Sequence, residues 1–162
     1  MKLIGSHMSK GGCMKLLNIS VTDNTSFESY DEALVCIYNK LYAEGVVKES
    51  WLGAMREREE SFPTGIELDG YAIAIPHCSS EHANKPAICI MRSQQPVSVN
   101  QADGDEELEV NLIISLIVTD PADQLQLLKA LFSNMQIEEF YKKLLALPIE
   151  EAKALFISTI IQ

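Results

Sequence analysis

The sequence is short of histidine, of paired cysteines and of long hydrophobic runs. It has 162 residues with three histidines and four cysteines. The cysteines form no CxxC pair, so the sequence predicts neither a disulfide scaffold nor a structural zinc site. The longest apolar run, residues 112–118, is far shorter than the roughly 18 to 20 residues that a membrane-spanning helix needs. We therefore expect a soluble, cytoplasmic protein with reduced thiols and no direct membrane insertion.

Basic residues are also scarce. There are 13 Lys and Arg against 23 Asp and Glu, which gives a formal net charge of −10. Lys and Arg are nowhere gathered into a stripe, and binding to nucleic acid or to anionic membranes depends on clustered positive charge. The sequence thus predicts no nucleic-acid partner. An acidic surface would steer a basic protein partner, and it also keeps a protein in solution.

The first residues are set apart from the predicted fold. The run Gly5–Met8 is typical of the remnant of a cleaved expression tag, and the apolar residues before it are too few for a signal peptide. We assign residues 1–12 to a tag remnant and disordered N-terminus, and residues 13–162 to a single domain, because this length suits one core. Only His77 and His82 remain as candidate functional histidines.

The spacing of apolar residues predicts alternating strands and helices. Branched apolar residues without helical spacing indicate strands, and apolar residues that recur every three or four positions after a capping residue indicate helices. Predicted strands cover 15–22, 71–75, 87–92 and 110–118, with a short edge strand at 97–99; predicted helices run from Ser29 or Asp31 to Gly45, over 49–60, from Asp120 through Phe132, and over 137–147 and 149–160. This order predicts an α/β fold, with a mixed β-sheet of about five strands sandwiched between helices on both faces.

For two of the predicted helices, the sequence also indicates which side chains are buried. In the helix that Asp120 caps, we assign five apolar residues to the buried stripe: Leu125, Leu127, Leu128, Leu131 and Phe132. In the helix 49–60, we expect Trp51, Leu52 and Met55 to face inward and residues 56–60 to form a charged, solvated last turn.

His77 follows the predicted strand 71–75 and Pro76. Pro76 has no N–H for a β-ladder, so the strand should end there and His77 should begin a loop at its carboxyl end. Ligands and reactive groups collect at this end of strands in open α/β sheets. An imidazole with an ordinary pKa of about 6.5 is largely neutral near neutral pH and can attack an electrophile. A single histidine without a nearby Asp–Ser arrangement suits phosphoryl transfer better than hydrolysis.

Two other interpretations of His77 stay open from the local sequence. It could be a structural loop histidine, or it could bind a metal together with Cys78 and His82, although their spacing matches no strong zinc signature. We expect Cys78 to be a small, half-buried residue. His82 and Glu81 lie in a polar stretch and are expected on the surface.

The segments on either side of residue 70 carry a recognisable pattern. Residues 58–66 read REESFPTGI and residues 72–77 read AIAIPH. This pattern resembles that of the fructose and mannitol class of enzyme IIA domains of the bacterial sugar phosphotransferase system (PTS), in which an Arg-Glu-Glu segment and a Thr-Gly turn lead into Ile-Ala-Ile-Pro-His. The resemblance continues through 87–92, 112–118 and 124–131. Without a fused IIB or HPr-like segment, the chain looks most similar to the galactitol-type branch.

The resemblance implies a cytosolic phosphocarrier, a component of a phosphotransferase. His77 matches the histidine that takes a phosphoryl group from phospho-HPr through Nε2 and passes it to a cysteine of a IIB protein, which serves a membrane IIC permease. The transported compound would be a sugar or sugar alcohol such as galactitol. Neither a cofactor nor a metal is implied. Arg58 matches an arginine near this site, where a guanidinium could hold phosphate oxygens or anchor the adjacent loop; a solvated charge at a helix end is the alternative.

One departure from the family pattern concerns a second histidine. Mannitol-type members carry it near the start of the helix after the long strand, and here Gln124 is aligned with it. An amide can donate to a phosphoryl oxygen but cannot carry a charge or a proton, and the first turn of a helix favours anions. Gln124 could also be a plain helix residue.

Two alternatives to the transport role remain open. The first is a phosphorylation-dependent regulator of the same fold, like the nitrogen-related enzyme IIA proteins. The second is a non-enzymatic metal- or ligand-binding module that uses His77 and Cys78.

Overall fold

The computed structural model describes residues 18–24 and 26–161. The assigned tag remnant at 1–12 and the first part of the predicted strand 15–22 lie outside the described residues. The rest of that strand is observed as β1, which begins at Asn18 and ends at Asn24.

The described residues form a mixed α/β structure. The strands are β1 (Asn18–Asn24), β2 (Gly65–Glu67), β3 (Ala72–Ala74), β4 (Ala87–Asn100) and β5 (Glu107–Ile117). The helices are α2 (Tyr30–Ala43), α3 (Trp51–Ser61), α4 (Pro121–Met135), α5 (Glu138–Ala146) and α6 (Ile149–Phe156), with a 3-10 turn at Ser80–His82 and a π-helical turn at Ile157–Ile161. The sheet has the strand order β1-β4-β5-β3-β2. The β1/β4 and β3/β5 pairs are parallel, whereas β4/β5 and β2/β3 are antiparallel.

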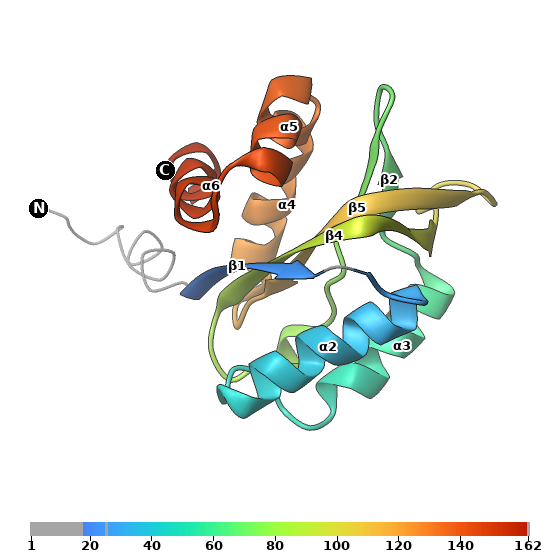
Figure 1. The fold of residues 1–162 in the computed structure, drawn as a ribbon. Helices are drawn as coiled ribbons and strands as arrows, with labels where there is room; N and C mark the ends of the chain where they lie inside the picture. Colours follow the sequence, from blue (N-terminus) through green and yellow to red (C-terminus); the bar gives the residue numbers. More distant parts are fainter. Residues whose placement is uncertain (1–17, 25, 162) are drawn as a thin grey trace, which may run out of the picture.

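Helices cover both faces of this sheet. Helices α2 and α3 lie on one face and α4, α5 and α6 on the other (Figure 1). Successive side chains of a strand point to opposite faces, so Cys89 and Met91 of β4 join the core under α2 and α3, while Ile88 and Ile90 join the core under α4 to α6. This arrangement explains why the predicted strands are apolar throughout. The predicted α/β fold, with a mixed sheet between two helical layers, is confirmed.

The end of the β4–β5 hairpin differs from the prediction. The predicted edge strand at 97–99 is the continuation of β4, which pairs with β5 on both sides of an irregularity between Arg92 and Val97.

The short strand β2 is absent from the prediction because three residues are too few to show a periodic pattern of apolar side chains. Its first residue, Gly65, must be glycine, since an added Cβ would lie 2.4 Å from the carbonyl oxygen of Asn100.

The buried side of α4 is narrower than predicted. Leu127 and Leu131 are buried, but Leu125 and Phe132 are 55% and 43% exposed. The buried stripe has a spacing of four and also contains Asp123 and Met135. Leucines that follow one another this closely in the sequence point to several sides of a helix, so one face cannot bury all of them.

The prediction of a charged, solvated last turn in α3 is also partly wrong, because Glu59 is buried.

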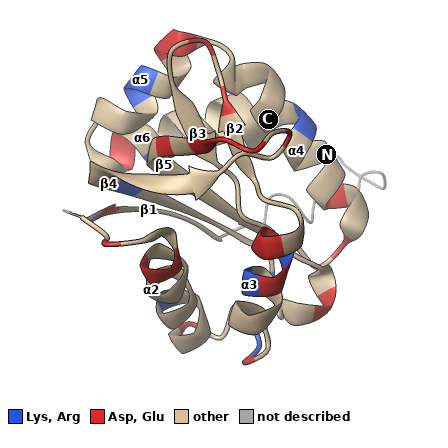
Figure 2. Ribbon diagram, turned by 90° about the vertical axis from the view of Figure 1, so that its right-hand side faces the viewer, with Lys and Arg blue, Asp and Glu red and all other residues tan. Residues whose placement is uncertain are grey.

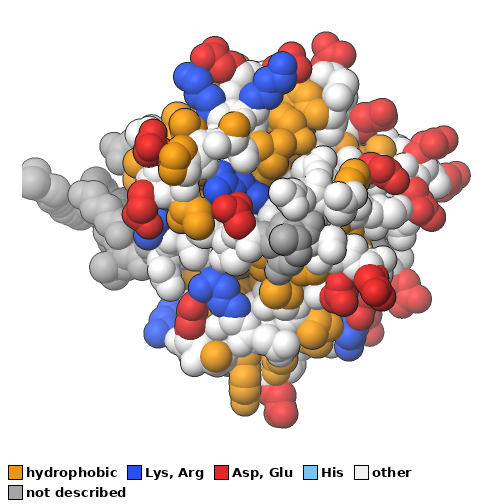
Figure 3. All heavy atoms as spheres, viewed as in Figure 1, with side chains coloured by type: hydrophobic (Ala, Val, Ile, Leu, Met, Phe, Trp, Pro, Cys, Tyr) orange, Lys and Arg blue, Asp and Glu red, His pale blue; other side chains and the backbone are white. Residues whose placement is uncertain are grey.

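Charge is unevenly distributed over the described surface. Lys and Arg are scattered over several elements, while Asp and Glu occur on both helical layers and on the strand connections (Figure 2). Acidic side chains crowd one side of the face in Figure 3, the side on which Figure 1 places the β4–β5 turn. Asp103, Asp105 and Glu106 of this turn are exposed. They stand before the first residue of β5, at the end of that strand away from His77.

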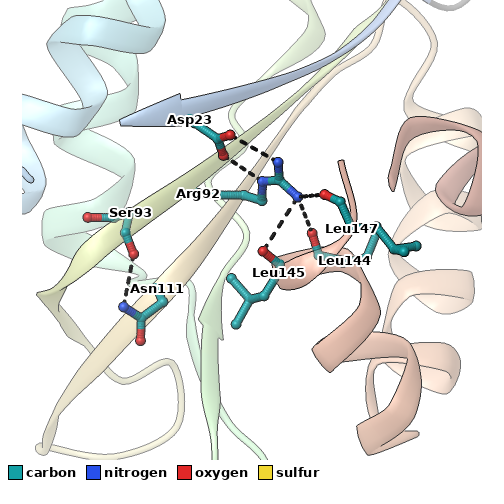
Figure 4. Close-up of polar contacts among 7 residues, drawn as sticks. All are labelled: Asp23, Arg92, Ser93, Asn111, Leu144, Leu145 and Leu147. Carbon is teal, nitrogen blue, oxygen red and sulfur yellow. Dashed lines mark hydrogen bonds and ion pairs between the residues drawn. The ribbon is translucent and has the colours of Figure 1, made fainter. Parts of the chain in front are cut away.

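A buried arginine joins the sheet to the helical layer (Figure 4). Arg92 of β4 donates from Nε and Nη2 to the Asp23 carboxylate at 2.7 and 3.1 Å. Its Nη1 donates to the carbonyl oxygens of Leu144 and Leu147 at 3.0 and 2.6 Å, at the end of α5. Carbonyl groups at a helix C-terminus lack intrahelical donors and attract positive charge. Arg92 therefore ties β1, β4 and α5 together.

We expect Arg92→Met to lower the free energy of unfolding by about 2 to 3 kcal/mol, because methionine leaves the α5 carbonyl groups without their donor. Urea unfolding measures this change. The matched control is Arg56→Met, which removes an exposed ion pair with Asp31 at 2.7 Å and should cost less than about 1 kcal/mol. Equal small losses in both variants would contradict the role assigned to Arg92.

Candidate functional site

The backbone around Pro76 places His77 at the edge of the sheet. Beyond β3, Ile75 N donates to the carbonyl oxygen of Thr64 at 3.2 Å, and the Pro76 carbonyl oxygen accepts from Leu116 N at 3.1 Å. These two bonds continue the pairing of β3 with both neighbouring segments. His77 then leaves the sheet next to the last residues of β5, where the sequence predicts it.

The hydrogen bonds of the His77 ring define its tautomer. Nδ1 lies 2.8 Å from the carbonyl oxygen of Ile75. Because a carbonyl oxygen can only accept, Nδ1 carries the hydrogen, and Nε2 of the neutral ring keeps its lone pair. Nη2 of Arg58 lies 3.4 Å from Nε2. The nitrogen that is available for chemistry therefore faces a guanidinium group.

The surroundings of His77 favour the neutral ring. Burial lowers the pKa of this half-buried imidazole, the hydrogen bond to the Ile75 carbonyl raises it, and the positive charge of Arg58 lowers it further. The pKa lies below its ordinary value as a result. The nucleophilic form of the ring is therefore the main form near neutral pH.

Arg58 is held in place by two contacts with Phe62. It lies in the last turn of α3, and its Nη1 donates to the carbonyl oxygen of Phe62 at 2.5 Å. Its guanidinium carbon also lies 5.4 Å from the centre of the Phe62 ring, within cation–π range. The structure thus brings Arg58 to His77, and Arg58 is not the isolated solvated charge that the sequence left as an alternative.

Gln124 lies beside the same loop. Its Nε2 donates to the carbonyl oxygen of Cys78 at 3.2 Å, so the amide supports the residue directly after His77. Cys78 is buried, and burial raises the pKa of its thiol to about 11, against the opposing effect of Arg58. A thiol that stays protonated is a poor nucleophile and a poor metal ligand.

His82 is anchored in the fold, contrary to the expected surface position. The ring is half-buried, and its Nδ1 lies 2.8 Å from the hydroxyl oxygen of Ser50 at the start of α3. Glu81 is exposed, as predicted. Within residues 18–24 and 26–161, no three His, Cys, Asp or Glu residues are grouped so that they could hold a metal ion.

Sequence reasoning missed a buried polar network next to the site. The Glu59 carboxylate accepts from Thr64 N at 3.2 Å, from the Thr64 hydroxyl, and from the Tyr30 hydroxyl at 3.2 Å. The available signal was the spacing of four from Trp51 through Met55 to Glu59, which places the glutamate on the buried stripe of α3.

The titration of His77 tests this description of the site. Because burial and Arg58 hold its pKa down, its NMR titration midpoint should lie below the ordinary value of about 6.5. Arg58→Met should move the midpoint upward, since a positive charge beside the ring is lost. Arg56→Met, two residues earlier on α3, should leave it unchanged. A wild-type midpoint at or above the ordinary value would contradict the geometry.

Comparisons with known proteins agree with the fold and with the sequence pattern. The family described as "Phosphoenolpyruvate-dependent sugar phosphotransferase system, EIIA 2" matches residues 15–158. The galactitol-specific EIIA component of the PTS from Escherichia coli (strain K12) is 41% identical over 141 residues, which cover 87% of this chain and 94% of the relative. The mannitol-specific enzyme IIA component of Enterococcus faecalis is 28% identical over 141 residues. This match covers 76% of this chain and 94% of the relative.

Solved structures share the fold at lower identity. The complex of enzyme IIAMTL and phosphorylated enzyme IIBMTL from Escherichia coli matches with a TM-score of 0.68 and 18% identity, over 86% of this chain and 94% of that one. The nitrogen regulatory protein IIA-Ntr of Neisseria meningitidis matches with a TM-score of 0.69 and 22% identity. This match covers 88% of this chain and 97% of that protein's chain. Among the described residues, no helix has the length and apolar character to cross a membrane. The family match and the 41% identity establish that the chain belongs to the EIIA type 2 family of PTS phosphocarriers, which are phosphotransferase components.

Proposed function

We propose that His77 accepts a phosphoryl group on Nε2 from phospho-HPr and passes it to a cysteine of a IIB protein. The observation that carries this proposal is the pair of contacts on the ring. The Ile75 carbonyl accepts from Nδ1 at 2.8 Å, and Nε2 is left with its lone pair 3.4 Å from a guanidinium nitrogen of Arg58. The ring is thus prepared for attack through one nitrogen.

The transfer balances with these groups alone. The Nε2 lone pair forms a bond to phosphorus while the bond from phosphorus to the donor's imidazole nitrogen breaks and returns its electron pair to that ring. The Nδ1 proton stays in its hydrogen bond to the Ile75 carbonyl. Transfer onward to a cysteine thiolate forms the S–P bond and breaks the Nε2–P bond.

Arg58 and Gln124 have distinct parts in this proposal. The Arg58 guanidinium lies beside Nε2, and in this proposal it donates charge-assisted hydrogen bonds to the equatorial phosphoryl oxygens and so stabilises the transferring group. Gln124 uses one amide hydrogen for the Cys78 carbonyl and has a second hydrogen for a phosphoryl oxygen. Gln124 then serves the site through its hydrogen bonds alone and carries no charge.

The proposed pathway is sugar-alcohol uptake. The 41% identical relatives are galactitol-specific components, which favours galactitol over the nitrogen-related regulatory role. The family also includes a member solved in complex with a phosphorylated IIB protein. We infer a cytoplasmic location, phospho-HPr as the donor, a IIB cysteine as the acceptor, and a membrane IIC permease served indirectly.

Phosphorylation of His77 is the direct test. Incubation with phosphoenolpyruvate, enzyme I and HPr should give an acid-labile, base-stable phosphoryl label, and His77→Gln should abolish it because no other residue replaces the ring. The control is His82→Gln, which should keep the label. Onward transfer to a galactitol IIB protein, and not to others, tests the pathway. Label that persists in His77→Gln would overturn the proposal.

Removal of the Arg58 guanidinium should slow the transfer without preventing it. We expect Arg58→Met to lower the single-turnover rate constant by about 100-fold, the range seen when one preorganised donor to developing charge is lost. Arg58→Lys keeps the charge but loses the planar fork and should be intermediate. The control Arg56→Met should react at the wild-type rate. If Arg58→Met reacts at the same rate as the control, Arg58 does not stabilise the transferring phosphoryl group.

A further inference from the structure

The Glu59 carboxylate is buried, with 9% of the residue exposed. Burial raises the pKa of this carboxyl group, and the hydrogen bonds from Thr64 act in the opposite direction. Oε1 accepts from Thr64 N at 3.2 Å, while Oε2 accepts from the hydroxyls of Thr64 and Tyr30. A carboxylate without such donors would be strongly destabilised at this position. Two of the three donors belong to Thr64.

Thr64 connects this carboxylate to the His77 ring. The Thr64 carbonyl oxygen accepts from Ile75 N at 3.2 Å. The carbonyl oxygen of the same Ile75 accepts from His77 Nδ1 at 2.8 Å. The position of Thr64 therefore sets the position of the carbonyl group that fixes the tautomer of His77.

Thr64 is also connected to Arg58. The carbonyl oxygen that anchors the Arg58 guanidinium at 2.5 Å belongs to Phe62, two residues before Thr64. The residue between them is Pro63, whose ring fixes its φ angle and stiffens this short segment. A displacement of Thr64 would thus move the anchor of Arg58 and the anchor of His77 together.

We propose that Glu59 is a positioning residue for phosphoryl transfer: by holding Thr64, it keeps the guanidinium and the imidazole aligned on each other. Glu59 follows Arg58 directly in α3, so neighbouring residues of one helical turn serve the two sides of the site. Glu59 acts only through Thr64 and does not touch the phosphoryl group. The kinetic part of this inference rests on the proposed function of His77, whereas its structural part does not.

A carboxylate has the hydrogen-bonding pattern that this position requires. Both of its oxygens only accept, and the three donors around it require acceptors on both oxygens. Glu59→Gln has nearly the same shape but replaces one oxygen by a donor group. Because the hydroxyls of Thr64 and Tyr30 can also accept, the amide can restore part of this network, but it loses the negative charge and one of the two acceptor oxygens. This variant therefore weakens the clamp on Thr64 with little change in volume. Glu60→Gln, at the next and exposed position, is the matched control.

Two measurements test the proposal on the full chain. In the unphosphorylated protein, NMR of the imidazole nitrogens should show one His77 tautomer in the wild type and in Glu60→Gln, and a mixture in Glu59→Gln. With phospho-HPr at saturating concentration, Glu59→Gln should transfer about 10- to 100-fold more slowly, the cost of a misplacement of up to about 1 Å. The HPr concentration at half-maximal rate should stay unchanged, since no docking residue is altered.

Variants of Thr64 keep the proposal testable if Glu59→Gln does not fold. Thr64→Val removes the hydroxyl and should reproduce both effects, while Thr64→Ser keeps the hydroxyl and should retain a single tautomer and most of the rate. A folded Glu59→Gln protein with the wild-type tautomer and rate would overturn the proposal, as would equal behaviour of Thr64→Val and Thr64→Ser. If the wild type is not phosphorylated at all, the proposed function fails, and the tautomer measurement still decides the positioning role.

Discussion

The hydrogen bond from His77 Nδ1 to the Ile75 carbonyl is the constraint on which the site depends. It is 2.8 Å long and leaves Nε2 as the ring nitrogen with a lone pair. Strand β3 ends at Ala74, and only Pro76 separates Ile75 from His77, so the carbonyl that fixes the ring and the ring itself come from one short stretch of backbone. Arg58 approaches Nε2, the nitrogen that this bond leaves without a hydrogen.

The sheet and its two helical layers supply the rigidity that this bond needs. The backbone before His77 is paired on both sides, through Ile75 N and the Pro76 carbonyl, and β3 is buried on both faces. Arg92 fixes the opposite layer by joining β1 and β4 to the end of α5. The acidic β4–β5 turn lies at the far end of β5, which separates the strongest negative charge of the hairpin from the proposed phosphoryl site.

Local signals in the sequence predicted the parts of the protein that depend on neighbouring residues. The proline after an apolar run placed His77, the Asp120 cap and Pro121 placed the start of α4, and the pattern around residue 70 indicated the family. The parts that depend on distant contacts were missed or wrong. Glu59 is buried because Thr64 and Tyr30 supply donors, and Leu125 and Phe132 are exposed because only one stripe of α4 meets the sheet. Neither set of contacts has a periodic signature.

In the proposed phosphorylated state, the phosphoryl group resides on Nε2 of His77 while Nδ1 keeps its proton. Phosphorus–nitrogen coupling measured by NMR on the phosphorylated, nitrogen-labelled protein tests it most directly. Phosphorus should couple to Nε2 of His77, and the Nδ1 proton should remain hydrogen-bonded. Coupling to Nδ1 of this ring, or to a nitrogen of another histidine, would contradict the proposed phosphorylation site.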